Sequence, residues 1–313
     1  MEHRRVGASG LRVSELGLGT MTWGRDTDEL DAAEQVRDFL DAGGTLIDTA
    51  AAYGEGEAET VIGTLLSGKV ARDDVVLATK AGTRRDASRG ALLDSLDASL
   101  RRMGTDHVDL FLVACPDGAT PLTETCSALR LAVTSGRARY AGLCNHPGWA
   151  TARAASLLSD DIGLPAVSLE YSLVQRGAER EALPAADALG MGLLAWSPLG
   201  RGVLTGKYRH GVPADSRAAS NHLAGFVAPY LEGEATSVVD AVGIAADGLG
   251  RAPAEVALSW LLERPRLASA IVGARTPAQL RTSLGATDLR LPAEVLSALD
   301  DVSAPPVGYP ERW

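Results

Sequence analysis

Residues 75–113 read VVLATKAGTRRDASRGALLDSLDASLRRMGTDHVDLFLV, which is two short apolar runs on either side of a longer amphipathic segment. The runs Val75–Thr79 and Val108–Val113 have the length and composition of buried strands. Between them, Arg89–Met103 repeats apolar residues at helical spacing, and Gly104 follows as a helix-ending residue. Two strands joined through a helix predict a parallel βαβ unit.

The same alternation continues over the rest of the chain. The eight expected strands are Glu15–Leu18, Thr45–Asp48, Val75–Thr79, Val108–Val113, Arg139–Leu143, Ala166–Leu169, Gly192–Ala195 and Ala270–Val272. Helical patterns between them include Asp28–Leu40, Arg89–Met103, Leu122–Thr134, Trp149–Leu158 and Pro277–Leu284. Eight strands alternating with helices predict an α/β fold, a (β/α)8 TIM barrel, and we expect residues 1–313 to form one such domain.

Two segments stand outside this repeat. Arg4–Val6 and Leu11–Val13 flank a glycine-containing turn, which predicts an N-terminal β-hairpin that covers the lower end of the barrel. Lys207–Ser237 is rich in Gly, Pro and Ala and shows no clear period, so we expect a mobile cover over the other end.

The composition excludes several classes of partner. With 30 Lys and Arg against 40 Asp and Glu, the net charge of −10 argues against a nucleic-acid or anionic-membrane surface. Cys115, Cys126 and Cys144 fit neither a disulfide framework nor a Cys-x-x-Cys metal site, so we expect no metal and a reducing compartment. No apolar run approaches the length of a membrane span, and we expect a cytoplasmic protein with a small-molecule substrate.

Asp48, Tyr53 and Lys80 are the first candidate site residues. Asp48 and Lys80 end neighbouring strands and Tyr53 lies on the loop between them, at the rim where barrels build their active sites. Reduction of a carbonyl needs a proton donor, and a phenol can serve if a lysine held by a carboxylate lowers its pKa from about 10. The alternative is a rim salt bridge with a tyrosine nearby.

Eight short motifs occur along the chain in a characteristic order. They are Gly17-Leu18-Gly19-Thr20-Met21, Leu46-Ile47-Asp48-Thr49-Ala50, Tyr53-Gly54, Ala78-Thr79-Lys80, Leu143-Cys144-Asn145, Glu170-Tyr171-Ser172-Leu173, Trp196-Ser197-Pro198-Leu199-Gly200-Arg201-Gly202 and Ile271-Val272-Gly273-Ala274. Over nearly its whole length the chain resembles the aldo-keto reductases. The resemblance implies Tyr53 as the catalytic general acid/base, tuned by Lys80 and Asp48.

One position departs from that family's catalytic tetrad. The histidine expected after the fourth strand is replaced by Ala114, which has no hydrogen-bond donor to offer a carbonyl oxygen. Cys115 is not expected to substitute, because consecutive strand residues point to opposite faces. His146 could approach the site from the next strand, although a place at the rim without a catalytic role is the favoured interpretation.

The resemblance also implies a nicotinamide dinucleotide site. Trp196 would stack on the nicotinamide and Asn145 would bind its carboxamide, while the loop from Ser197 carries the pyrophosphate with Lys207 close by. The full expected set is Gly19, Thr20, Asn145, Trp196, Ser197, Pro198, Leu199, Arg201, Gly273, Arg275 and Gln279. Arg275, with Arg281, could hold a 2′-phosphate at a helix N-terminus, which favours NADPH over NADH. A surface arginine without such a role is the alternative.

Further departures concern contacts to the cofactor. Cys144 replaces the family's serine, Ser168 replaces a glutamine, and Thr282-Ser283 stands where a Glu-Asn pair often follows. Each exchange removes a polar contact.

These residues lead to two functional hypotheses. The first is an NADPH-dependent oxidoreductase that reduces a ketone, keto-sugar or enone in a pocket formed by Met21, Trp23 and Ala114, with Tyr309–Trp313 folding over its mouth. The alternative for these aromatic residues is ordinary packing. The second is an altered family member that binds cofactor or ligand without ordinary carbonyl reduction, as a non-redox enzyme, sensor or partner subunit. The intact Asp48, Tyr53 and Lys80 favour the first, because a buried charged cluster is costly to keep without a use.

Overall fold

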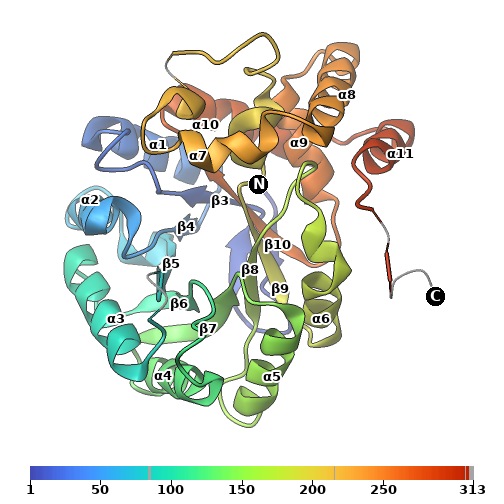
Figure 1. Cartoon of the computed structure of the whole chain (residues 1–313). Helices are drawn as coiled ribbons and strands as arrows, with labels where there is room; N and C mark the ends of the chain where they lie inside the picture. Colours follow the sequence, from blue (N-terminus) through green and yellow to red (C-terminus); the bar gives the residue numbers. More distant parts are fainter. Residues whose placement is uncertain (84–85, 215, 307, 310–313) are drawn as a thin grey trace.

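A closed barrel of eight parallel strands forms the centre of the computed structural model, which describes residues 1–83, 86–214, 216–306 and 308–309 (Figure 1). Its strands are β3 (Leu16–Gly19), β4 (Leu46–Asp48), β5 (Val76–Ala81), β6 (Val108–Val113), β7 (Ala138–Cys144), β8 (Ala166–Glu170), β9 (Gly192–Trp196) and β10 (Leu267–Gly273). Each strand pairs with the next along the chain, and β10 closes the barrel on β3. The predicted (β/α)8 fold is confirmed.

Helices surround the strands as an outer ring (Figure 1). They are α1 (Glu29–Asp41), α2 (Glu57–Leu66), α3 (Arg89–Met103), α4 (Leu122–Thr134), α5 (Gly148–Leu158), α6 (Ala182–Ala188), α9 (Pro253–Leu262) and α10 (Pro277–Leu284). Side chains cap three of them, since Asp28, Ser88 and Thr276 accept backbone N–H groups at the starts of α1, α3 and α10. The bounds predicted for α3, α4 and α10 match the structure.

The N-terminal hairpin closes the lower end of the barrel, as predicted. β1 (His3–Arg5) pairs antiparallel with β2 (Arg12–Ser14). Val6, Leu11 and Val13 are buried against apolar side chains of the barrel interior. Gly7 has a positive φ, and a Cβ there would lie 2.4 Å from the Gly190 carbonyl oxygen, so only glycine lets the turn approach so closely.

The connection after β9 is more regular than its sequence indicated. Among its described residues it contains a 3₁₀ turn at Arg217–Ala219, the short helix α7 (Ala224–Val227) and a further 3₁₀ turn at Ala228–Tyr230. Helix α8 (Glu234–Leu249) begins before the predicted end of the irregular segment, and α11 (Ala293–Val302) follows the barrel near the C-terminus. We call residues 207–233 the cover segment.

Candidate active site

A cavity of about 540 Å³ opens at the carboxyl ends of the strands. Every residue of the predicted site except Trp23 lines it, although these residues come from segments spread between positions 19 and 279. The barrel brings them together because the carboxyl ends of all its strands meet at one rim.

Asp48 and Lys80 form a buried ion pair on neighbouring strands of this cavity. Lys80 Nζ donates to Asp48 Oδ2 at 2.6 Å and to the Thr49 carbonyl oxygen at 2.8 Å. The same ammonium lies 5.3 Å from the centre of the Tyr53 ring. The second carboxylate oxygen of Asp48 is buried without a partner among the described residues, so a ligand hydroxyl could bind it.

The electrostatic balance differs from the sequence expectation for Tyr53. Burial raises the pKa of its phenol and Asp48 adds to that rise, while the Lys80 ammonium opposes it. The expectation of a lowered phenol pKa is therefore wrong, because desolvation outweighs the cation. For Lys80, burial acts to lower the pKa, but the facing Asp48 carboxylate prevails and the pKa is raised. At neutral pH the site thus presents a protonated phenol beside an ammonium.

Trp196 and Asn145 are connected at the rim. The indole Nε1 donates to Asn145 Oδ1 at 3.0 Å, and Asn145 Nδ2 donates to the Ala114 carbonyl oxygen at 3.0 Å. Asn145 and Ser197 both have positive φ, of 58° and 50°, a conformation that is uncommon outside glycine and that persists where the surroundings enforce it. These contacts fix the orientation of the indole at the cavity wall.

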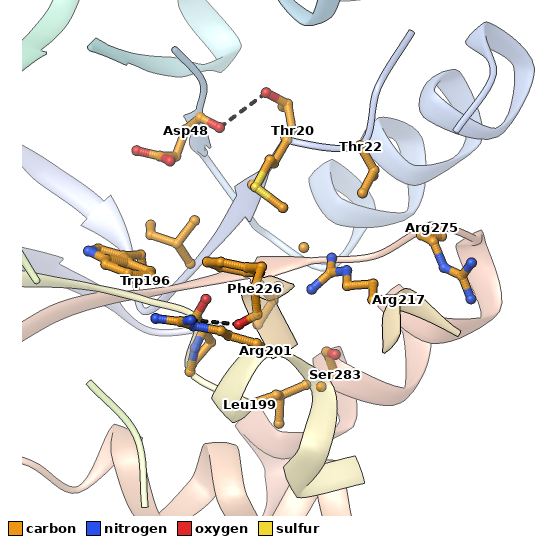
Figure 2. A pocket seen from close by; sticks show the side chains of 18 of the residues that line it. Thr20, Thr22, Asp48, Trp196, Leu199, Arg201, Arg217, Phe226, Arg275 and Ser283 are labelled. Atoms are coloured by element: carbon orange, nitrogen blue, oxygen red, sulfur yellow. Dashed lines mark hydrogen bonds between the residues drawn. The ribbon is translucent and has the colours of Figure 1, made fainter. Parts of the chain in front are cut away.

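Arg201 is engaged within the protein. Its guanidinium makes a bidentate pair with Glu170 at 2.7 and 2.6 Å and donates to the Phe226 carbonyl oxygen at 2.6 Å. It also stacks on the rings of Phe226 and Tyr230, at 4.1 and 4.9 Å from their centres. Figure 2 shows Arg201 beside Trp196 and Phe226, with its hydrogen bond to the Phe226 carbonyl oxygen. The charge of Arg201 is therefore already paired within the protein. Its contacts connect the cover segment to the barrel.

Two other arginines offer positive charge to the cavity. Arg217 and Arg275 both line it, and among the described residues no carboxylate pairs with either (Figure 2). Burial first, and then the like charge of Arg275, lowers the pKa of Arg217. Nearby, Gln279 in α10 accepts the Arg275 backbone N–H at 3.0 Å. An anion bound near Arg217 and Arg275 would reduce the repulsion between their charges.

Arg281 does not join this pair. Its guanidinium contacts Glu34 at 3.1 Å and also pairs with Asp38, both in α1. The sequence hypothesis that Arg281 helps Arg275 to hold a phosphate is thus not supported, because Arg281 already has two carboxylate partners outside the cavity.

Trp23 was expected in the substrate wall, and the structure places it in the core. Its side chain is fully buried and its indole N–H donates to Gln35 Oε1 at 3.3 Å. The adjacent Gly24 has a φ of 76° and packs against Glu57, which turns the chain away from the cavity directly after Met21 and Thr22.

His146 and Cys115 also differ from their expected places. His146 is buried with Nδ1 2.8 Å from the Cys144 carbonyl oxygen, and it does not line the cavity. Cys115 does line it, although its thiol donates to the Gly82 carbonyl oxygen at 3.1 Å. Strand alternation misplaced Cys115 because β6 ends at Val113, two residues earlier.

Several residues of the cavity wall carry no signal in the sequence. Thr22, Thr83, Arg217 and Phe226 line it, the last two from the cover segment. Their positions depend on how the connecting segments fold back over the barrel. A periodic pattern in the local sequence cannot predict that. Of the predicted Tyr309–Trp313 cover, Tyr309 is exposed and residues 310–313 lie outside the described part of the chain.

The described residues contain no group of three or more His, Cys, Asp or Glu side chains arranged to hold a metal ion. No helix in the same part of the chain combines the length and apolar character needed to cross a bilayer.

Comparison with known proteins agrees with this architecture. The model of the aldo/keto reductase family matches residues 15–304. The uncharacterized oxidoreductase YrpG of Bacillus subtilis is 36% identical, over 100% of this chain and 99% of its own. The L-glyceraldehyde 3-phosphate reductase of Escherichia coli K12 is 35% identical, over 96% and 92%. A probable voltage-gated potassium channel subunit beta of rice is 32% identical, over 100% and 98%. The chain therefore belongs to the aldo/keto reductase family of oxidoreductases.

Proposed function

We propose that this protein reduces a carbonyl group of a small molecule with NADPH, and that Tyr53 is the proton donor. The observation that carries the proposal is a single cavity with the Tyr53–Lys80–Asp48 cluster in one part and Arg217 and Arg275 in another, where no carboxylate of the described residues pairs with either arginine. NADPH matches this arrangement, because its nicotinamide ring and its 2′-phosphate lie at opposite ends of an extended molecule.

The cavity wall fits such a cofactor. Trp196 offers a flat aromatic face beside Asn145, and Asp48 Oδ1, which has no partner in the described part of the chain, can accept a hydroxyl. Gly202 lines the cavity with a φ of 103°, and a Cβ there would lie 3.4 Å from Lys207 Nζ, so the backbone at this point adjoins a cation. Arg217 and Arg275 provide a charged fork for a phosphate.

In the proposed mechanism the residues of this chain control a proton. A bound reduced nicotinamide would supply hydride to the carbonyl carbon, which leaves negative charge on the oxygen. Tyr53 then donates its phenolic proton to that oxygen, and the Lys80 ammonium stabilises the resulting phenolate. Asp48 holds Lys80 in place through the 2.6 Å bond and keeps it charged.

Ala114 determines which carbonyl compounds fit. It lines the cavity where the family has a histidine, so the site lacks one donor and gains room beside Tyr53. Met21 and Phe226 add apolar surface to the wall. We infer a substrate bulkier than a simple aldehyde, such as a ketone, keto-sugar or conjugated enone, for which the added space compensates the missing hydrogen bond.

Removal of one cavity arginine tests the cofactor assignment. Arg217→Ala or Arg275→Ala should raise the Kd for NADPH by about 10- to 100-fold, because each removes a charge-assisted contact to the 2′-phosphate. The Kd for NADH, which lacks that phosphate, should change by less than about threefold. Fluorescence titration measures both. Arg281→Ala is the matched control and should alter neither Kd, since Arg281 pairs with α1. Equal loss of both cofactors in the cavity variants would contradict the assignment.

The activity itself is tested on a panel of carbonyl compounds after NADPH binding has been measured. The proposal expects NADPH consumption with at least one bulky ketone or enone. Tight NADPH binding with no turnover on the panel would instead favour the second hypothesis, a ligand-binding protein without carbonyl reduction. A relative described as a probable channel subunit makes that outcome worth measuring.

A further inference from the structure

Tyr53 begins a turn with an unusual backbone. Gly54, Glu55 and Gly56 follow it with φ values of 57°, 58° and 101°. Left-handed residues usually occur singly, and Glu55 has a side chain that disfavours this region. Such a turn persists only where neighbouring groups enforce it.

Arg102 of α3 supplies one such neighbour. A Cβ added to Gly56 would lie 2.8 Å from Arg102 Nε and 2.9 Å from Arg102 Cδ. The arginine side chain therefore packs directly on the backbone of the turn, and glycine at position 56 leaves the space for it.

Glu59 of α2 holds this arginine and reaches the strand of the catalytic lysine at the same time. Its side chain is fully buried. One oxygen, Oε2, accepts from Arg102 Nε at 2.8 Å and Nη2 at 2.6 Å. The other, Oε1, accepts from Thr79 Oγ1 at 2.6 Å, and Thr79 directly precedes Lys80 in β5.

We propose that Glu59 and Arg102 are positioning residues, which fix the Tyr53 turn against the strand that carries Lys80. One oxygen of the Glu59 carboxylate binds the arginine that packs on the Tyr53 turn, and the other binds the residue before Lys80. Neither Glu59 nor Arg102 lines the cavity. Their effect on the rate rests on the proposed role of Tyr53. They act by holding the Tyr53 hydroxyl in position, since a displacement of about 1 Å at a reacting group can lower the rate roughly 100-fold.

The alternative is a bridge that only stabilises the packing of α2 on α3. These helices are close in any case, because a Cβ at Gly63 would lie 2.2 Å from the Arg102 carbonyl oxygen. A matched control is therefore needed. Asp109 accepts from Arg72 at 2.8 Å and from the Leu77 backbone N–H at 2.8 Å, at the opposite end of β5 and β6. Asp109→Asn weakens a comparable partly buried bridge away from the cavity.

The kinetic test compares Arg102→Met, Arg102→Met with Glu59→Gln, Arg102→Lys and Asp109→Asn. The double variant leaves no unpaired buried charge, so it is the one to use if the single variant does not fold. We expect Arg102→Met and the double variant to lower kcat about 10-fold or more, with KM and the Kd for NADPH within about twofold. Arg102→Lys should recover part of kcat. Asp109→Asn should lower the melting temperature and leave kcat unchanged.

A second readout requires no turnover. The phenolate absorbance of the protein minus that of its Tyr53→Phe counterpart follows the titration of Tyr53, whose charged or titratable neighbours are Lys80, Asp48 and Cys144. Release of the turn should admit water to the phenol and bring its raised pKa down toward the ordinary value of about 10. Asp109→Asn should not move it. If the unmodified protein shows no turnover, the proposed function is contradicted, and the titration of Tyr53 alone then tests the positioning role of Glu59 and Arg102. If the Arg102 variants and Asp109→Asn give the same titration and the same change in kcat, the bridge is only structural and the proposal is wrong.

Discussion

Tyr53→Phe should lower kcat for carbonyl reduction by about 100- to 10,000-fold, while the Kd for NADPH stays within about threefold. The substitution keeps the ring that packs near Lys80 and removes only the hydroxyl. Without that proton the developing negative charge on the carbonyl oxygen loses its proposed donor, and Ala114 offers no replacement. Single-turnover measurement of NADPH consumption at saturating cofactor gives the rate of the chemical step directly.

Tyr171→Phe is the matched control for this prediction. Tyr171 is also buried and donates its hydroxyl to Glu179 at 2.7 Å, but it lies outside the cavity and packs against Trp260. It should reduce stability and leave kcat nearly unchanged. Similar kcat losses in the two variants would mean that the Tyr53 hydroxyl has no special part in the reaction.

Ala114→His should raise kcat/KM for small aldehydes by about 10- to 100-fold. The backbone at this position is fixed, because Ala114 N donates to the Ala81 carbonyl oxygen at 2.8 Å and the Ala114 carbonyl oxygen accepts from Asn145 at 3.0 Å. A larger side chain at 114 must therefore enter the cavity. An added imidazole N–H would supply the second donor to the carbonyl oxygen, a contribution of about 100- to 1,000-fold where geometry is ideal.

Ala114→Leu separates the added donor from the reduced volume. Both variants should lose activity toward bulky ketones, because both fill the space beside Tyr53. Only the histidine variant should gain activity toward small aldehydes. A histidine variant no faster than the leucine variant on small aldehydes would show that the absent donor does not limit the rate.

Much of the fold follows from the sequence because its signals are local. Each barrel strand is a short apolar run, and α3, α4 and α10 begin and end at their predicted residues. The rim residues Asp48 and Lys80 could be paired in advance, since the carboxyl ends of neighbouring parallel strands lie side by side. The cover segment gave no such signal, because its short turns are held by distant contacts such as that of Arg201 with Phe226.

The errors in the site have local physical causes. Strand alternation stops with the strand, so it could not place Cys115 two residues beyond β6. The left-handed backbone of Asn145 turns the chain, and His146 bends back to the Cys144 carbonyl oxygen. Arg217 reaches the cavity from a segment without periodicity, and the family motifs considered did not include it. Positive φ values outside glycine and long connections thus mark where sequence reasoning fails in this protein.

The pH dependence of single-turnover NADPH consumption tests the central claim, that the protonated phenol of Tyr53 delivers the proton. Burial raises the folded-state pKa of Tyr53, so the phenol stays protonated at neutral pH and loses its proton only above the ordinary value of about 10. We therefore predict a rate constant that is flat from about pH 6 to pH 9 and falls with one ionisation at higher pH. The residual rate in Tyr53→Phe should lack that fall. A rate that already declines near pH 7, or an alkaline fall that persists in Tyr53→Phe, would contradict the assignment of Tyr53.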